Sequence, residues 1–578
     1  MKKKYFLLFI LSLLLIASCR VDEPDNILTA EKDNEFDAGS SIVFPALDNQ
    51  SIADLGLLCK IWGFLKYHHP AVGKGNYNWD YELFRFLPKY LQVKNTAERD
   101  RLILDWIDKY GKIPVCTTCR ETPSDAFIKP DLLWAENSNM NNALKEKIRE
   151  IYQNRHQGDH YYIRIGVDAE IPEFLNEVPK MTYNLYYPDA GFRLLTLFKY
   201  WNMIRYFYPN KYMTDRNWDA LLPEYVPLFI LANSRLEYEM ATFQLIGEIN
   251  DTHAASISGG VEIQKIKGSY YAPFRVWFIE GKLVVTDIYN PELMSASDIK
   301  IGDVITEIDG ETVESIIENR KKYYPASNEA SLLRNISLDL LRSASNTISI
   351  QSVQGGQKTI QLYQRSALNI YNTYKVDWNE KCYRYLDDSI CYVTLSSITV
   401  EDIPEIQKAF NNSKAYIIDI RNYPNTSAIF SFLPYFVSTT TPYAKFSYGN
   451  SNNPGEFTFT PPYVIQRGSW TYQGKLIVIV NEISQSHAEF TAMALRAGIN
   501  TTIIGSTTSG ADGNVTYIDL PGGFRTTISG IGVFYPDGTE TQRVGIVPDI
   551  WIEPTIEGIR EGRDELLEKA ISLINEEK

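Results

Sequence analysis

The sequence predicts a multidomain α/β protein in which helical modules precede a small β-rich domain and a C-terminal α/β core. Three observations support this fold class. An aromatic helical segment occurs twice near the N-terminus, apolar residues alternate as in strands in the middle of the chain, and short continuous apolar runs alternate with helices after it. The 578 residues are enough for two to four domains with their own cores.

Composition and motifs exclude several classes of function. Acidic residues outnumber basic ones, 71 to 57, and no tract is rich in lysine or arginine, which disfavours a nucleic-acid partner. The glycine-rich stretch Ser509–Gly513 lacks the lysine and hydroxyl residue of a phosphate-binding loop, so no nucleotide is expected. Cys116 and Cys119 form a lone C-x-x-C without a second pair or a nearby histidine. The sequence therefore predicts neither a metal nor a cofactor, and the pair reads as structural or incidental thiols.

The N-terminus has the features of a secretion signal. Three lysines precede the apolar run Tyr5–Ala17, which is shorter than the ~20 residues needed to span a bilayer. The run ends in small residues before Cys19 and resembles a bacterial lipoprotein processing site, which implies cleavage before Cys19 and lipid on its thiol. Residues 1–19 are then the signal peptide and 20–45 an acidic tether. The expected location is the cell envelope, with a lipid anchor in the outer membrane, facing the periplasm or the surface.

The repeat defines two helical modules, expected at 46–184 and 185–268. Residues 60–70 and 78–80 recur 139 positions later, from Lys199 onward. In each copy an aromatic helix ends at a proline, and Asn-Trp-Asp opens the next helix. The adjacent His68 and His69 diverge by about 100° on a helix, so surface or packed imidazoles are favoured over a metal site.

The β-rich domain is expected at 269–365. Strands are predicted at Phe274–Ile279, Leu283–Asp287, Thr347–Val353 and Gln357–Leu362, with a helix around Val313–Tyr323. The segment from Ile299 to Val313, which contains Gly302 and Asp303, resembles the signature of PDZ domains. The resemblance implies that a peptide adds to the sheet as an extra strand and that Gly302 and Asp303 take part in binding it. An unrelated small β-rich module is the alternative.

The C-terminal region, 366–578, is expected to hold a sheet covered on both faces, because its strand-like runs are continuously apolar. These runs are Ser389–Leu395, Ala415–Ile420, Lys475–Val480 and Thr502–Ile504. Cys382 and Cys391 flank a predicted hairpin turn in this region and could bridge it.

A serine-rich turn connects the strand Lys475–Val480 to a helix. Helix N–H groups and the helix dipole favour negative charge there, which suits an acyl-transfer nucleophile, although such a serine can also be a simple N-cap. The segment from Asn481 to Glu489 resembles the motif Asn-x-x-(Ser/Thr)-x-Ser-x-(Ala/Ser)-Glu of the C-terminal processing peptidase and tricorn-core family. The resemblance implies a ClpP/crotonase-like peptidase core with Ser486 as nucleophile.

Other segments extend this resemblance from about Phe192 to Ile550. Residues 417–425 look like the family's oxyanion strand and loop, with Asn422 and Asn425 in place of glycines. Residues 509–513 and 544–550 look like its glycine-rich stretch and its closing Gly-x-x-Pro-Asp. The implied oxyanion hole consists of the backbone N–H groups of Tyr423 and His487.

The family resemblance also bears on the general base. The lysine of the processing peptidases is replaced by Ala511, which disfavours a serine–lysine dyad. Residues 247–254 are similar to the tricorn-like segment in which histidine is the base, which implies this role for His253. His487 is the competing candidate. The pattern implies that Thr252 and Glu540 orient the imidazole, although Gln542 occupies the more closely matching spacing before Gly545.

The function expected from these features is a lipid-anchored serine endopeptidase that cleaves polypeptides, with a polypeptide substrate and the membrane as its partners. One alternative is a catalytically weak scaffold of the cell envelope that binds peptides through its PDZ domain. A third possibility is that the tryptophan-rich and tyrosine-rich helical modules bind glycans, although burial in a core explains these residues more simply.

Overall fold

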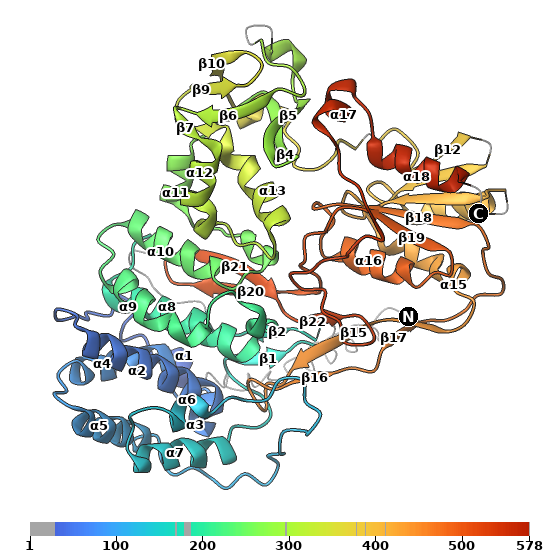
Figure 1. Cartoon of the computed structure of the whole chain (residues 1–578). Helices are drawn as coiled ribbons and strands as arrows, with labels where there is room; N and C mark the ends of the chain where they lie inside the picture. The colour runs from blue at the N-terminus through green and yellow to red at the C-terminus, as the bar shows by residue number, and fades with distance from the viewer. Residues whose placement is uncertain are drawn as a thin grey trace, which may run out of the picture.

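The computed structural model describes residues 29–167, 170–177, 186–294, 298–376, 378–387, 389–410 and 412–576. Cys19 and the signal segment lie outside these ranges, as does the first part of the tether. The helical region and the α/β core lie at opposite ends of the molecule, and the β-rich domain sits above them (Figure 1). Within the described ranges, no helix is both long enough and apolar enough to cross a membrane.

The N-terminal half is built almost entirely of helices. They are α1 (Thr29–Lys32), α2 (Asn49–His68), α3 (Pro70–Gly73), α4 (Trp79–Tyr90), α5 (Thr96–Asp108), α6 (Leu133–Glu136), α7 (Asn142–Gln153), α8 (Ala190–Phe207), α9 (Leu222–Ile230), α10 (Arg235–Gly247) and α11 (Val261–Lys267). Two short strands, β1 (Ile163–Ile165) and β2 (Pro172–Phe174), form a hairpin. A 3-10 turn, η3 (Thr252–Ala255), follows α10.

The repeated segments form matching structures on α2 and α8. In the first copy the indole nitrogens of Trp62 and Trp79 each donate to the other residue's carbonyl, at 3.1 and 2.9 Å. In the second copy Trp201 and Trp218 make the same reciprocal pair, both at 3.0 Å. The two helices cross closely at corresponding positions, because a Cβ added at Gly63 would lie 1.9 Å from Asn202.

Ion pairs tie the two copies together reciprocally. In each copy the aspartate of Asn-Trp-Asp binds one cation of its own copy and one of the other. The pairs are Lys66 and Lys199 with Asp80, at 3.1 and 2.9 Å, and Arg205 and Lys60 with Asp219, both at 2.9 Å. Lys66 and Lys199 are fully buried and share Glu177 at 2.7 Å, so their charges are paired within the core.

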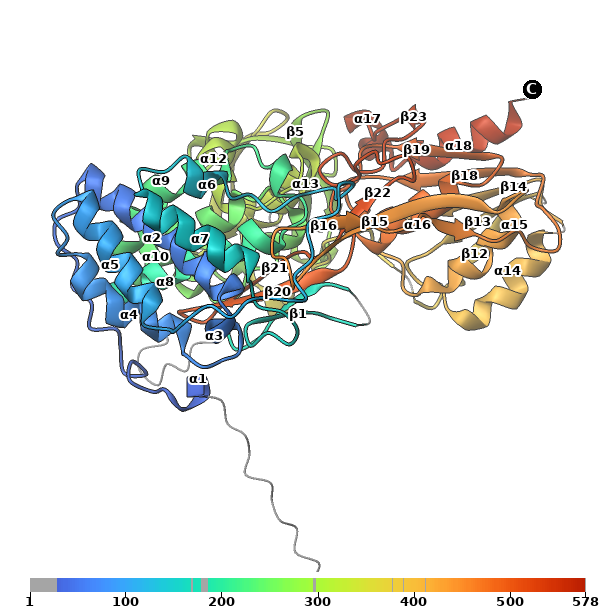
Figure 2. The same cartoon turned by 90° about the horizontal axis from the view of Figure 1, so that it is seen from below.

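The two modules share one hydrophobic core instead of forming separate domains. That core also contains residues from the hairpin of β20 (Val515–Leu520) and β21 (Phe524–Ser529), which belongs to the far C-terminal part of the chain. The hairpin lies beside the helices in both views (Figures 1 and 2). Most tryptophan side chains of the modules are buried, which accounts for the aromatic residues without a glycan site.

The histidines of the first module are packed in its core. The ring of His68 stacks on that of Phe64 at 4.4 Å, and His69 Nδ1 accepts the N–H of Ala71 at 3.2 Å. Burial lowers the pKa of His68 to about 3, of His69 to about 4 and of His160 to about 3. Each of these imidazoles is therefore neutral in the fold at neutral pH.

Acidification should consequently destabilise the helical region. These histidines take up protons near pH 6.5 in the unfolded chain but only near pH 3 to 4 in the fold, so stability falls as the pH drops through this window. At about 1.4 kcal/mol per pH unit, lowering the pH from 6.5 to 5 costs about 2 kcal/mol per histidine. We expect a lower Tm at pH 5 than at pH 7.5, and a smaller decrease for His69→Gln. Equal Tm values at both pH values would contradict this account.

The β-rich domain has a sheet of strand order β10-β9-β6-β5-β4, with β7 paired to β6. These strands are β4 (Phe274–Ile279), β5 (Lys282–Ile288), β6 (Val304–Ile308), β7 (Glu311–Thr312), β9 (Thr347–Ser352) and β10 (Gly356–Gln361). A second small sheet contains β3 (Tyr270–Tyr271), β8 (Arg342–Ser343) and β11 (Tyr363–Gln364). The predicted helix is α12 (Val313–Arg320), whereas α13 (Glu329–Leu340), which packs on β4, was not predicted.

The α/β core contains a sheet of order β12-β13-β14-β18-β19-β23, parallel except for the edge strand β12. Its strands are β12 (Tyr383–Asp387), β13 (Ile390–Thr394), β14 (Ala415–Asp419), β18 (Lys475–Val480), β19 (Thr501–Gly505) and β23 (Ile550–Trp551). One face packs against α14 (Ile403–Phe410), α15 (Leu433–Phe436) and α16 (His487–Arg496), and the other against α18 (Glu565–Asn575). The prediction of a sheet covered on both faces is confirmed.

A smaller antiparallel sheet connects the core to the helical region. It contains β15 (Thr441–Gly449), β16 (Phe457–Phe459), β17 (Tyr463–Ile465) and β22 (Gly532–Phe534). Ile128 of the helical region forms a β-bridge with Phe457 of β16. The helix α17 (Ile556–Glu561) lies between this core and the β-rich domain.

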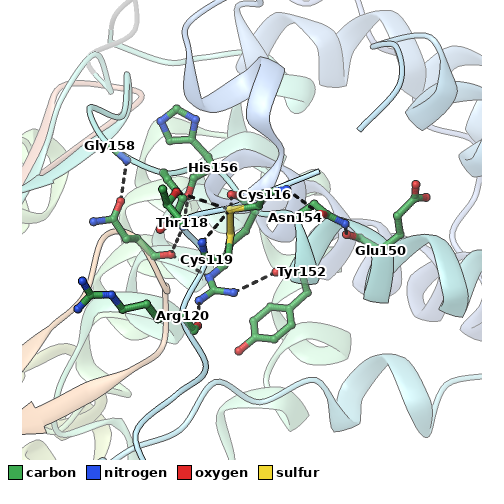
Figure 3. The surroundings of a disulfide bond; sticks show 12 residues. Cys116, Thr118, Cys119, Arg120, Glu150, Tyr152, Asn154, His156 and Gly158 are labelled. Atoms are coloured by element: carbon green, nitrogen blue, oxygen red, sulfur yellow. Dashed lines mark hydrogen bonds between the residues drawn. A yellow bond between two sulfur atoms is a disulfide. The ribbon is translucent and has the colours of Figure 1, made fainter. Parts of the chain in front are cut away.

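The cysteines differ from the expectations. Cys116 and Cys119 form a disulfide with a Cα–Cα distance of 5.6 Å, in a loop held by Asn154, whose Oδ1 accepts the Cys116 N–H at 2.9 Å (Figure 3). The suggested bridge between Cys382 and Cys391 is wrong. Both are buried free thiols, because Cys391 lies opposite Tyr385 in the β12–β13 ladder and is out of register with Cys382.

Candidate active site

Ser486 stands at the turn between β18 and α16. It is the N-cap residue of α16 and adopts φ 55° and ψ −119°. A non-glycine residue rarely takes a positive φ, and such strain concentrates at functional sites, where the surrounding structure maintains it. The half-buried serine is thus held at the positive end of a helix dipole, as the sequence motif predicted.

A buried carboxylate maintains this turn. Glu489 accepts hydrogen bonds from the N–H groups of Ser486, Gly510 and Ala511, at 3.0, 2.8 and 3.1 Å. It also accepts one from the hydroxyl of Thr508 at 2.5 Å. Burial raises the pKa of Glu489, and these donors oppose the increase. The carboxylate therefore fixes the nucleophile turn and the glycine-rich stretch against each other.

The two predicted oxyanion donors lie near each other, Tyr423 on the loop after β14 and His487 at the first residue of α16. The rings of Tyr423 and His487 have centroids 6.1 Å apart. Neither backbone N–H donates to any group within the described ranges, so both are available to a ligand. Asparagines replace glycines in the Tyr423 loop, and the amide of Asn422 ties it to Tyr374: Oδ1 accepts the Tyr374 N–H at 2.9 Å and Nδ2 donates to its carbonyl at 3.0 Å.

His253 lies in the turn η3 with its imidazole buried. Its Nδ1 is 2.9 Å from Ser529 Oγ and 3.6 Å from Asp251 Oδ1. Its Nε2 is buried and has no partner among the described residues. Burial lowers the pKa of His253, whereas the charge of Asp251 raises it. A neutral imidazole with one nitrogen oriented and the other bare has the arrangement that a general base requires.

The carboxylate of Asp251 connects the turn of His253 to Ser529, whose hydroxyl lies beside the imidazole. This carboxylate accepts the backbone N–H of His253 at 3.0 Å and that of Ser529 at 2.7 Å. Asp251 is completely buried. Sequence reasoning missed both residues. Asp251 could have been noticed beside Thr252 and His253, whereas Ser529 comes from β21 and carries no local signal.

Thr252 and Glu540 do not contact the imidazole. The hydroxyl of Thr252 bonds Ser331 Oγ at 3.0 Å and Ser509 O at 3.3 Å. Glu540 faces Tyr212, and its charge, together with burial, raises the pKa of that phenol. The expectation that these two residues orient His253 is therefore corrected, because Asp251 and Ser529 occupy the Nδ1 side.

Gln542, which has the more closely matching spacing before Gly545, is connected to the turn of His253, whereas Glu540 faces Tyr212. Gln542 is buried, and its Nε2 lies 3.5 Å from Ser327 Oγ. That hydroxyl in turn accepts the N–H of Thr252 at 2.9 Å. Gln542 thus supports the turn that carries His253 through Ser327 and Thr252.

The glycine-rich stretch brings the serine and histidine segments together. Ser509 accepts the Thr252 hydroxyl through its carbonyl and donates its own N–H to Ser484 O at 2.9 Å. Two residues later, Ala511 O accepts the N–H of Ser486 at 2.9 Å. The turns that carry Ser486 and His253 are consequently anchored on the same short loop, although they lie far apart in the sequence.

The β-rich domain also contacts the nucleophile turn. The indole of Trp277 on β4 donates to Glu482 Oε1 at 2.6 Å. Arg334 on α13 donates to Glu482 O at 2.8 Å and to Gln485 Oε1 at 3.0 Å. A cavity of about 430 Å³ opens beside these contacts, between the two domains. The position of this domain is therefore coupled to the residue that precedes Ser486.

Gly302 and Asp303 form a structural turn before β6. Gly302 has φ +87°, donates its N–H to Val285 O at 2.8 Å, and receives a hydrogen bond from Arg560 of α17 at 3.1 Å on its carbonyl. The carboxylate of Asp303 accepts the N–H of Lys300 at 3.1 Å. The expectation that they bind peptide is thus corrected, since their polar groups are engaged and Gly302 packs against the core.

Comparison with known proteins agrees with this architecture. Residues 389–552 match the model of peptidase family S41, and residues 268–390 match that of a PDZ domain. Solved structures with a similar fold include mature CPAF complexed with lactacystin, at 15% identity and a TM-score of 0.52, and mature CPAF, at 14% and 0.50. Each comparison covers 67% of this chain and 98% of the other. No curated protein matches the chain in sequence.

The fold and the motifs together define a peptidase domain of the serine type preceded by a PDZ domain. The likeness to peptidase family S41 covers residues 389–552 of the chain, directly after the part that matches a PDZ domain.

Proposed function

We propose that the protein is a lipid-anchored endopeptidase of the cell envelope that cuts unfolded or C-terminally exposed polypeptides, with Ser486 as nucleophile and His253 as base. One observation carries the assignment of the base. The buried His253 has a bare Nε2 and an Nδ1 beside Ser529 and Asp251, and its turn is joined to that of Ser486 through the loop at Ser509.

The chemistry follows from this arrangement. In the tautomer with the proton on Nδ1, His253 donates to Ser529 Oγ with the Asp251 carboxylate close by, which leaves Nε2 free to take the proton of the Ser486 hydroxyl. Ser486 Oγ attacks the scissile carbonyl, and the N–H groups of His487 and Tyr423 stabilise the oxyanion. His253 then protonates the leaving amine, and water, deprotonated by the same imidazole, hydrolyses the acyl ester.

Half-exposed aromatic side chains lie at the start of the helix that Ser486 caps and favour an apolar substrate residue at the scissile bond. The ring of Phe430 stacks on that of His487 and on that of Phe490, in both cases with centroids 5.8 Å apart. His487 and Phe490 belong to the first turn of the helix that Ser486 caps. Apolar side chains on an unfolded substrate would bury surface against this group of rings.

The proposed activity is tested with an unfolded protein substrate such as reduced casein. The wild type should degrade it, whereas Ser486→Ala should not. Ser427→Ala is the matched control, because Ser427 Oγ lies 3.4 Å from His487 Nε2 but has no role in the chemistry. If the folded wild type binds unfolded peptides without hydrolysing any, the alternative of a peptide-binding scaffold is favoured.

The lipid anchor is a separate part of the proposal and rests on the resemblance of the segment before Cys19 to a lipoprotein processing site. In a Gram-negative host, the full chain should incorporate radiolabelled palmitate and fractionate with membranes. Cys19→Ser should lose the label. Equal labelling of both proteins would exclude lipidation at this residue.

A further inference from the structure

A second cavity, of about 190 Å³, opens at the carboxyl edge of the core sheet. Thr394 at the end of β13, Ser396 just after it, and Arg421 and Asn422 after β14 contribute to its wall. Asn422 directly precedes Tyr423, whose N–H is one of the proposed oxyanion donors. A residue next in sequence to a proposed oxyanion donor therefore lines the cavity.

The described residues of the cavity wall carry an excess of positive charge. Three exposed cations line the cavity, namely Lys375, Lys381 and Arg384. In the described part of the chain, none of them has a carboxylate oxygen within ion-pair distance. Lys381 is 3.4 Å from the Tyr383 hydroxyl, and the guanidinium of Arg384 lies over the ring of Tyr392 at 5.1 Å. Neither of these contacts supplies a negative charge, and the pKa of Glu405 is lowered by Lys408 and also by the charge of Lys381.

Two other charged residues of the wall, Asp419 and Arg421, are paired with each other. Asp419 is held by the Arg421 guanidinium at 2.6 Å and by the Tyr392 hydroxyl at 2.7 Å, and Arg421 also binds Asp564 at 2.7 Å. Glu380 is the one further carboxylate among the described residues of the lining. The chain as a whole has a net charge of −14, so this local positive excess runs against its overall composition.

Hydroxyl groups provide additional hydrogen-bond donors. Thr394 Oγ1 and Ser396 Oγ lie 2.9 Å apart and share one hydrogen bond, which leaves the second hydroxyl hydrogen of the pair for a ligand. Ser397 also lines the cavity. Cations together with hydroxyl donors around a volume of this size suit a carboxylate, and the space is too small for a folded partner.

We propose that this cavity is a substrate subsite that binds a carboxylate of the polypeptide while a nearby peptide bond lies at Ser486. The inference rests on the proposed function, because it takes the polypeptide substrate from there. The carboxylate can belong to an aspartate or glutamate side chain or to the end of the chain, and both sources present the same group to Lys375 and Arg384.

Binding can be measured without hydrolysis in the full-length Ser486→Ala protein. The probes are three fluorescent peptides of one apolar sequence, read by anisotropy. The first has an internal glutamate and an amidated end, the second has a free terminal carboxylate, and the third is neutral and amidated. We expect at least one of the two carboxylate peptides to bind about tenfold more tightly than the third, which corresponds to about 1.4 kcal/mol.

Charge reversal then locates the carboxylate. With Lys375→Glu and Arg384→Glu combined, the tenfold advantage should disappear while the neutral peptide binds as before. The matched control combines Lys112→Glu and Arg467→Glu, two exposed cations outside the cavity, and should keep the advantage. The combination of Lys375→Gln and Arg384→Gln should lose most of the advantage and guards against misfolding of the charge-reversed protein. The peptide that shows the advantage identifies the source of the carboxylate.

Two results would overturn the subsite. The three peptides could bind equally, or the carboxylate advantage could persist in the charge-reversed protein, which would assign it to another surface such as the PDZ domain. Neither result depends on catalysis. Hydrolysis of the neutral peptide by the wild type separately tests the proposed function, so failure of the subsite and failure of the peptidase activity are distinguishable.

Discussion

His253→Ala should lower kcat/KM for peptide hydrolysis by about four orders of magnitude, because it removes the group that takes the proton from Ser486 and returns it to the leaving amine. The measurement is hydrolysis of a fluorogenic peptide by variants with unchanged thermal unfolding. His487→Gln is the matched control and should keep most of the activity, since its backbone N–H is retained. If His487→Gln abolished hydrolysis while His253→Ala retained it, the assignment of the base would be wrong.

The pH profile gives the same prediction an independent test. Hydrolysis should decrease on the acid side as the His253 imidazole becomes protonated. The charge of Asp251 raises the pKa of His253, so Asp251→Asn should move the acid limb of kcat/KM to lower pH as well as lowering the rate. An acid limb that does not move in Asp251→Asn would show that this carboxylate does not act on the catalytic imidazole.

Glu489→Gln should nearly abolish activity and should also destabilise the core. The carboxylate accepts three backbone N–H groups and one hydroxyl in a fully buried site. Glutamine offers one acceptor oxygen and directs an NH₂ group at the remaining donors, and buried donors left without a partner cost about 1 to 3 kcal/mol each. The positive φ of Ser486 would then lose its main support.

Thermal unfolding and labelling of Ser486 together check this prediction. The expected result is a lower Tm with loss of both labelling and hydrolysis. Glu482→Gln serves as the control, because Glu482 is partly exposed and keeps its backbone contacts to Arg334. Wild-type stability and activity of Glu489→Gln would mean that the nucleophile turn maintains its conformation without this carboxylate.

The sequence predicted the parts of the fold that local patterns encode. Strand β18 and helix α12 were placed correctly because continuous or periodic apolar residues define them. The repeat predicted two related modules but not their common core, since the interlocking of Lys66, Lys199 and Asp80 depends on the crossing of α2 and α8. The contribution of the β20–β21 hairpin to that core is a long-range contact without a sequence signal.

The candidate active site shows the same difference between what short sequence motifs indicate and what long-range contacts determine. Ser486 and His253 could be proposed because short motifs surround them, and the structure joins their turns through one loop. The groups on Nδ1 of His253 could not be inferred from spacing, because Ser529 lies on a distant strand and Asp251 acts from within the same turn. Glu540 has a suitable chemistry and sequence position, yet its side chain faces Tyr212.

The central claim is that Ser486 is a nucleophile activated by His253, and covalent labelling with a fluorophosphonate probe tests it most directly. The account predicts that the wild-type protein is labelled and that peptide mass spectrometry places the adduct on Ser486. Labelling should be absent in Ser486→Ala and slowed by orders of magnitude in His253→Ala. A folded wild type that does not label at permissive pH with peptide present, or an adduct on another residue, would contradict the account.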